Sequence, residues 1–138
     1  MLITKEIDYA LRIISALASG RHLTAGEICR QELAPQQFGY KILKKLEKGG
    51  LIQITRGSEG GCRLACDLRE VTLYDLIRIM EAEGWVSACM DPEFKCARRE
   101  QNENRCRIHE KLAGVQQKLN QELKKSSLYE IVDGRTVE

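Results

Sequence analysis

Hydrophobic residues in the first eighteen positions recur at the spacing of an amphipathic helix. The face that they form comprises Ile7, Ala10, Leu11, Ile14, Leu17 and Ala18. Gly20 is expected to end this helix. A second helix is expected from the segment TAGE to about Leu33, because Thr24 and Glu27 can form a capping box. The chain is therefore expected to begin with two helices.

The segment PQQFGYKILKKLEK, residues 35–48, predicts a third helix with two distinct faces. Pro35 suits its first position, where the backbone N–H has no helical partner, and Gly49-Gly50 is expected to stop it. The apolar face comprises Phe38, Ile42, Leu43 and Leu46; the polar face comprises Gln37, Tyr40, Lys41, Lys44 and Lys48. We expect the first face to pack in the core and the second to meet a partner.

Two short runs after the third helix predict a β-hairpin. LIQIT, residues 51–55, and CRLA, residues 62–65, are rich in β-branched or alternating apolar residues and flank the glycine-rich turn RGSEGG. Three short helices followed by a basic hairpin are typical of a winged helix-turn-helix domain. In such a domain the third helix enters the major groove of DNA.

The second half of the chain is also mainly helical in its pattern. VTLYDLIRIMEAE, residues 71–83, predicts a fourth helix that Thr72 caps, with Asp75 at its third position. Gly84 is expected to end it. An irregular segment of roughly twenty residues follows, to about Arg105, and a loop of that length usually has a function or is disordered.

A long last helix is expected over residues 107–125. It places apolar residues at alternating spacings of four and three, at Ile108, Leu112, Val115 and Leu119. This narrow seam favours pairing with an identical helix in a homodimer. Glu122 interrupts the seam, so docking of the helix on its own domain stays as the alternative.

The expected fold class is therefore mainly α: a winged helix-turn-helix with a small two-stranded β wing and a long C-terminal dimerisation helix. We expect residues 1–70 to form the DNA-binding domain and residues 71–138 to form the sensor loop and the dimerisation helix. The composition agrees with a folded chain, because 43% of the residues are hydrophobic and 30% are charged.

The sequence gives no sign of export or of a membrane partner. The first residues reach charged Lys5 and Glu6 at once, and no apolar run approaches the roughly 18 residues of a membrane span. We therefore expect a cytoplasmic protein.

Charge is unevenly distributed and favours a polyanionic partner. Residues 1–66 carry ten Lys and Arg against six Asp and Glu, whereas residues 67–138 carry twelve against fourteen. The expected contacts to double-stranded DNA are Gln36, Gln37, Tyr40, Lys41 and Lys44 on the third helix, and Arg56 and Ser58 in the hairpin turn. Arg56 is placed to enter an adjacent minor groove. A merely solvated lysine face is the alternative, but the order of elements favours DNA.

Six cysteines in a reducing compartment are better interpreted as thiols or metal ligands than as disulfides. Three of them follow the fourth helix as Cys89-x6-Cys96-x9-Cys106-x2-His109. Zinc sites usually pair cysteines at closer spacing, whereas an iron-sulfur cluster can be reached by dispersed thiolates with an imidazole as a further ligand. A cluster, zinc and plain reduced thiols all stay open on spacing alone.

The other three cysteines are expected to have packing roles. Cys29 is expected to be a small buried hydrophobic residue in the second helix. Cys62 and Cys66 are four apart, so both are expected to lie on one face of the second strand.

Three features together identify a family resemblance. DYALRIISALA in the first helix, the wing segment GGLIQITRGSEGGCRLA and the three-cysteine loop resemble the bacterial iron-sulfur winged-helix regulators, IscR-like and NsrR-like. The same group includes a cluster-free regulator of cysteine metabolism. The resemblance implies a homodimer that binds an inverted-repeat operator and pairs its long C-terminal helices.

The resemblance also implies a ligand set. Cys89, Cys96 and Cys106 match the family's cluster thiolates. For the fourth ligand, His109 matches the histidine of the IscR type, and Asp8 matches the first-helix carboxylate with which the NsrR type reaches the partner subunit's cluster. The loop is longer than is typical, so both a [2Fe-2S] and a [4Fe-4S] cluster stay open. Tyr40 stands where the IscR type has a glutamate that discriminates between sites, so the operator preference differs.

The sequence thus predicts a transcriptional regulator, most simply a repressor, whose operator binding an iron-sulfur cluster controls in response to redox or nitric oxide signals. Two other classes remain: a winged-helix regulator that senses through zinc or free thiols, and an interaction module that does not bind DNA. No enzyme is expected, since the sequence shows no paired carboxylates, nucleophile–base pair or phosphate loop.

Overall fold

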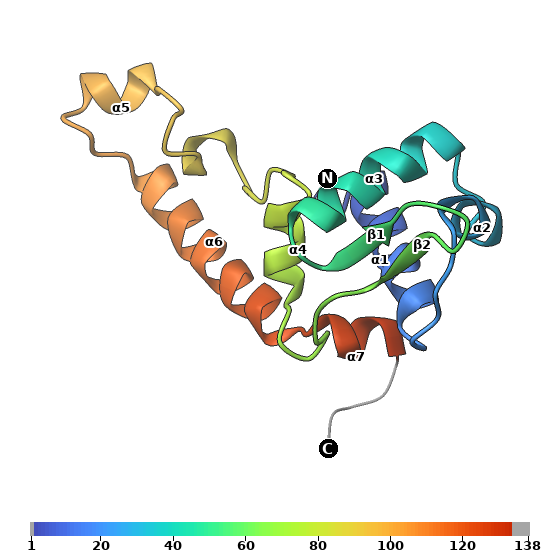
Figure 1. Ribbon diagram of the computed structural model, residues 1–138. Coiled ribbons are helices and arrows are strands. Elements are labelled where there is room, and N and C mark those ends of the chain that lie inside the picture. Colours follow the sequence, from blue (N-terminus) through green and yellow to red (C-terminus); the bar gives the residue numbers. More distant parts are fainter. Residues whose placement is uncertain (1, 134–138) are drawn as a thin grey trace.

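The computed structural model describes residues 2–133, which form a winged helix-turn-helix body with a long helical arm (Figure 1). The helices of the body are α1 (Lys5–Leu17), α2 (Ala25–Gln31), α3 (Gln36–Lys48) and α4 (Leu73–Ile79). Its wing consists of strands β1 (Ile52–Thr55) and β2 (Gly61–Leu64). The remaining elements are η1 (Ala88–Met90), α5 (Ala97–Gln101), α6 (Arg107–Lys125) and α7 (Leu128–Asp133). The expected mainly helical fold with a two-stranded wing is confirmed.

The starts of the predicted helices are set by capping residues. The hydroxyl of Thr4 accepts a hydrogen bond from the Ile7 amide at the start of α1. At α2 the Glu27 amide donates to the Thr24 hydroxyl, which is one of the two bonds of the expected capping box. At α4 both bonds of the box between Thr72 and Asp75 are present.

Two helices end earlier than expected, and one starts a residue later. Leu33 and Glu81 have φ angles of 54° and 55°, which a helix cannot contain, so α2 ends at Gln31 and α4 ends at Ile79. Pro35 has a ψ angle of 134° and caps α3 from outside instead of being its first residue. The expected end of the fourth helix at Gly84 is therefore wrong, and the segment toward the loop begins at Glu81.

A close approach between α2 and α3 fixes the helix-turn-helix. Cys29 is buried in α2, as the sequence predicts, and a Cβ atom added to Gly39 of α3 would overlap the Cys29 sulfur. Gly39 is therefore needed for the two helices to pack at this distance.

This contact predicts a compensating pair of substitutions. We expect Gly39→Ala to lower the free energy of unfolding by about 1–3 kcal/mol, because the added methyl group overpacks the contact. In a Cys29→Ala background the sulfur is gone, so the same change should be neutral or stabilise by up to about 1 kcal/mol through helix propensity. Urea denaturation of the four proteins measures the cycle. An equal cost in both backgrounds would contradict it.

The wing is an antiparallel hairpin attached to the helices at two points. β1 and β2 pair from Ile52 with Leu64 to Thr55 with Gly61. Cys62 is buried and exchanges two backbone hydrogen bonds with Leu23, which extends the small sheet toward α2. Cys66 lies beyond the end of β2, so the expectation that it shares a strand face with Cys62 is wrong.

α7 is an element that the sequence analysis missed. Leu128 is fully buried, and the chain returns to the body through backbone bonds from Leu128 to Val71 and from Leu73 to Ser126, both 2.8 Å. α7 packs against α1 (Figure 1). The core therefore includes residues from both ends of the chain.

α6 forms the arm and has the expected bounds. Its second half packs on α4, where Leu123 is buried, which confirms the docking alternative for that half. In its first half Ile108 and Val115 are 54% and 52% exposed. Within residues 2–133, the helices are too short or too polar to cross a membrane.

Candidate functional site

The outer face of α3 and the wing expose polar side chains on either side of a shared groove. The side chains expected to contact DNA are all exposed: Gln36, Gln37, Tyr40, Lys41, Lys44, Arg56 and Ser58. A groove between α3 and the wing is lined by Tyr40, Lys44, Ile54 and Arg56, among others. The structure thus brings residues of α3 and of the wing together on one side of the molecule, as the predicted winged helix-turn-helix requires.

Two contacts hold this surface in shape. The side-chain amide of Gln36 donates a hydrogen bond to the hydroxyl of Tyr40, one turn along α3, at 3.1 Å. Glu47, near the end of α3, accepts a hydrogen bond from the Ile54 amide at 3.2 Å. The second contact fixes the wing to the helix, so their spacing is set before any DNA is bound.

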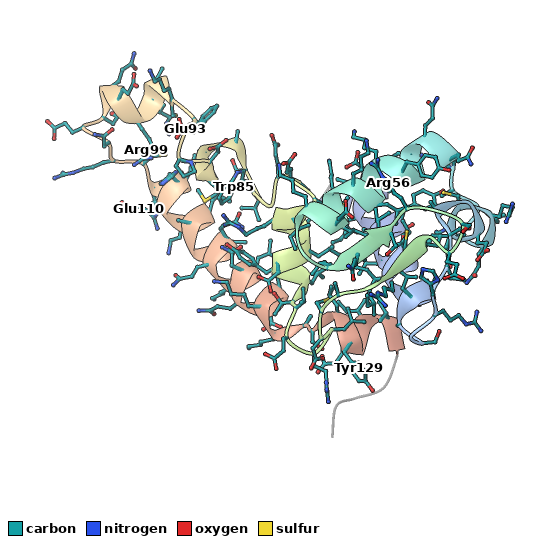
Figure 2. All side chains as sticks on the ribbon, in the orientation of Figure 1. Arg56, Trp85, Glu93, Arg99, Glu110 and Tyr129 are labelled. Carbon is teal, nitrogen blue, oxygen red and sulfur yellow. The ribbon has the colours of Figure 1, made fainter. Side chains whose placement is uncertain are left out.

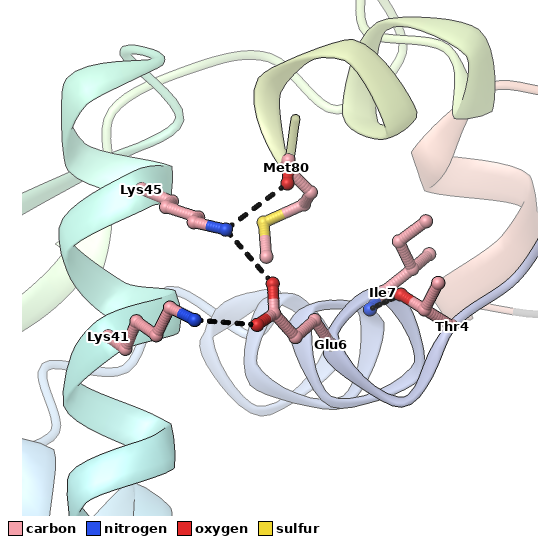
Figure 3. Close-up of polar contacts among 6 residues, drawn as sticks. All are labelled: Thr4, Glu6, Ile7, Lys41, Lys45 and Met80. Atoms are coloured by element: carbon pink, nitrogen blue, oxygen red, sulfur yellow. Dashed lines mark hydrogen bonds and ion pairs between the residues drawn. The ribbon is translucent and has the colours of Figure 1, made fainter. Parts of the chain in front are cut away.

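Glu6 joins the first helix to two lysines of α3 (Figure 3). Its carboxylate lies 3.1 Å from the Lys41 ammonium and 3.0 Å from the Lys45 ammonium. Lys45 also donates to the backbone carbonyl of Met80, at 3.3 Å. The two lysines, Lys45 first, hold the pKa of the Glu6 carboxyl below its usual range. The sequence analysis missed Glu6 and Lys45, since no local pattern pairs residues so far apart.

The three loop thiols lie in or next to three different helices. Cys89 is in η1, Cys96 precedes α5 and Cys106 precedes α6, and each is half-buried and reduced. The hydroxyl of Ser87 lies 3.4 Å from the Cys89 sulfur. Among the described residues, no three His, Cys, Asp or Glu side chains lie close enough together to hold a metal ion. The loop therefore carries three thiols that do not form a common metal site among the described residues.

His109 lies in the first turn of α6 and has a nitrogen without a hydrogen-bond partner. Its Nδ1 atom is buried and has no hydrogen-bond partner among residues 2–133. Burying such an atom without a partner costs free energy, so it is suited to bind a further group. Figure 2 shows this loop end of the molecule, marked by Arg99 and Glu110, far from Arg56 on the winged-helix side. Three thiols and one unpaired imidazole fit an iron-sulfur cluster in donor type.

Asp8 is placed differently from the loop donors. It lies on the exposed side of α1 and forms an ion pair with Arg12 at 3.0 Å. Asp8 would have to exchange this partner to bind a metal. Because α1 belongs to the body and not to the loop, Asp8 is a candidate for reaching a partner subunit rather than its own loop.

The start of the loop is fixed to α6 by Gln116. Its side-chain oxygen accepts from the Val86 amide at 2.7 Å, and its nitrogen donates to the Gly84 carbonyl at 2.8 Å. The same nitrogen donates to Asn120 at 2.9 Å. η1, which carries Cys89, packs on α6 as well. Cys89 is therefore held against the helix whose start carries Cys106 and His109.

The other thiols are not suited to reactivity. Burial raises the pKa of Cys29, and burial together with the nearby Glu47 charge raises that of Cys62. Burial and the adjacent Asp67 raise the pKa of Cys66. Thiols with a raised pKa are poor nucleophiles, which supports the packing role predicted for Cys29 and Cys62.

Comparison with known proteins supports the winged-helix fold and a role in transcriptional regulation. The family model Rrf2, described as an iron-dependent transcriptional regulator, matches residues 3–134. Protein aau3 of Rhizobium meliloti is 33% identical over 99 residues, which are 70% of this chain and 64% of that protein. The chain thus spans less than two thirds of the length of that relative.

Two solved structures resemble the whole chain. One is T. potens IscR, with 16% identity, a TM-score of 0.65 and coverage of 100% of this chain and 93% of that one. The other is CymR, the global cysteine regulator of B. subtilis, with 20% identity, a TM-score of 0.63 and 99% coverage of both chains. At these identities the likeness establishes the fold.

Proposed function

Because the chain belongs to the Rrf2 family of transcriptional regulators, we propose that it is a homodimeric repressor whose binding to an inverted-repeat operator is controlled by an iron-sulfur cluster. Residues 1–70 bind DNA in this proposal, and residues 71–138 sense the signal and pair the subunits. In this proposal the protein acts in the cytoplasm, where the operator is.

The observation that carries the DNA-binding part is the shared exposed surface of α3 and the wing. Amide, phenol and ammonium groups at Gln37, Tyr40 and Lys44 can donate to base edges and phosphates. Lys41 is 60% exposed despite its pair with Glu6, so it can turn to a phosphate. Arg56, at the start of the turn, extends the surface to the neighbouring minor groove.

Arg56→Ala is expected to weaken duplex binding about tenfold and to reduce its salt dependence, because one cationic contact is lost. The side chain is exposed at the groove between α3 and the wing, so the thermal midpoint should change little. Fluorescence anisotropy over a salt series measures both quantities, with a duplex selected from a random pool by the wild-type protein. Arg69→Ala, which removes the same charge from an exposed pair with Asp67, is the control. Equal effects of the two substitutions would contradict the role of Arg56.

The cluster part rests on the loop donors. We propose that Cys89, Cys96 and Cys106 bind iron as thiolates, with His109 Nδ1 or the partner subunit's Asp8 as the fourth ligand. A bound cluster would supply metal–sulfur bonds that are sensitive to oxidants and nitric oxide. The chain's own contribution is to hold Cys89 against α6 through Gln116 and to keep the Cys106 and His109 donors at the start of that helix.

The dimer part rests on the uncovered half of α6. Ile108 and Val115 are seven residues apart, so they share a face, and both are more than half exposed. An apolar seam of this kind is expected to pair with the same seam of a second copy. Pairing there would set the distance between two α3 helices, which must match half-sites about 34 Å apart.

The metal content of protein purified without oxygen tests the cofactor directly. We expect a brown protein with matched iron and sulfide. A colourless protein that stays so after reconstitution would contradict the cluster and leave the second candidate, a regulator that senses through zinc or reduced thiols. The observation that favours its thiol form is that, among the described residues, the three loop thiols are not gathered into one ligand set. One zinc ion per chain would then indicate the zinc-sensing form, and no zinc would indicate the thiol-sensing form.

A further inference from the structure

Lys45 is the least exposed of the cations on α3 that form ion pairs, and it has two partners on other helices. Its side chain is 23% exposed, against 60% for Lys41. It pairs with Glu6 of α1 and donates to the carbonyl of Met80, the residue that caps the end of α4 (Figure 3). Through this one ammonium group the DNA-reading helix is bonded to the point where the chain leaves α4.

Residues 81–86 connect α4 to the loop, and we call this segment the strut. It is held at one end by the bond from Lys45 to the Met80 carbonyl and at the other by the bond from the Val86 amide to Gln116. Glu81 has a φ of 55°, which turns the chain out of α4. Gly84 and Val86 are then hydrogen-bonded to Gln116, which is 6% exposed and is the one buried polar side chain among residues 2–132. Only residues 81–85 therefore separate the Met80 carbonyl, to which Lys45 donates, from the Val86 amide, which Gln116 holds on α6.

We infer that Lys45 is a positioning residue that couples the sensor loop to the recognition helix through the Met80 carbonyl. The inference rests on the proposed function in one respect, that α3 reads DNA while the loop senses the signal. Because coupling between two sites is reciprocal, binding of DNA to α3 must also change the stability of residues 81–86. That consequence can be measured without any bound cluster.

Backbone amides within the strut report on its opening. The amides of Glu81, Ala82 and Val86 donate to Arg78, Ile77 and Gln116, so they exchange with solvent only when the strut opens. Lys45→Met keeps an unbranched apolar side chain, one atom shorter, and removes the charge. Lys45→Arg keeps the charge and can still reach both partners, so it serves as the matched control.

Hydrogen exchange of the full chain, with and without a duplex selected from a random pool by the wild-type protein, tests the inference. In the wild type we expect the duplex to change the exchange of residues 81–86 by about fivefold or more. Lys45→Met should lose this change while α3 is still protected by the duplex, and Lys45→Arg should restore it. Thermal midpoints of the three proteins show whether each variant is folded.

The outcomes separate the inference from the proposed function. An unchanged response of residues 81–86 in folded Lys45→Met would overturn the inference, as would a wild type that binds duplex without any response there. If Lys45→Met does not fold, Lys45→Ala takes its place, because it also removes the contacts to Glu6 and Met80; an unchanged response in folded Lys45→Ala would overturn the inference, and loss of the response would support it. If the wild-type protein is colourless, the cluster proposal fails but the hydrogen-exchange test still applies. If the wild-type protein selects no duplex, both DNA binding by α3 and the coupling are refuted.

Discussion

Cys96→Ala is expected to reduce the iron and sulfide content of anaerobically purified protein to near zero. Cys96 is half-buried at the middle of the loop, and its two neighbouring ligand thiols lie on other elements, so no nearby thiol can replace it. The fold should survive, because the side chain belongs neither to the core nor to a hydrogen-bonded network. Metal analysis and far-UV circular dichroism measure the two properties.

Cys66→Ala is the matched control for this experiment. Cys66 is also half-buried, but it lies between the wing and α4, outside the loop. The Cys66→Ala protein should retain the iron content of the wild type. Equal iron in Cys96→Ala and in the wild type would refute the assignment of the loop thiols as ligands.

Val115→Glu is expected to convert the dimer to a monomer and to weaken duplex binding by about 10²-fold or more. A charge buried in an apolar seam is costly, and a monomer loses the gain in affinity from binding two half-sites at once. Because Val115 is 52% exposed in the single chain, the monomer itself should stay folded. Analytical ultracentrifugation and anisotropy measure the two effects.

Gln117→Glu adds the same charge two residues along α6, on an exposed position outside the seam. It should leave the sedimentation of the dimer unchanged. If Gln117→Glu dissociates the protein as strongly as Val115→Glu does, charge repulsion along the helix and not the seam explains the effect. A dimeric Val115→Glu protein would place the dimer interface elsewhere.

The sequence predicts best where one local pattern decides the structure. Helical spacing and capping residues identify α1 and α4, and the bounds of α6 are predicted to the residue. The exposed face of α3 follows from the same periodicity. These features depend on residues within one or two turns of each other, so a single sequence contains the information.

The sequence predicts poorly where distant segments decide the structure. α7 has only six residues, and its helix is stabilised by burial of Leu128 against the body, which no local pattern reveals. Its one local signal is Ser127, whose hydroxyl accepts from the Glu130 amide three residues on. The early end of α4 depends on the backbone at Glu81, and the pairing of Lys45 with Glu6 spans 39 positions.

The measurement that tests the central claim most directly is the dissociation constant for one selected duplex, before and after removal of iron by a chelator under anaerobic conditions. If the loop controls the recognition helices, the two constants should differ by at least about fivefold, the lower end of usual allosteric coupling. Cys96→Ala should show the iron-free value with and without chelator. Equal constants for the iron-containing and iron-free wild type would contradict control of DNA binding by the cluster.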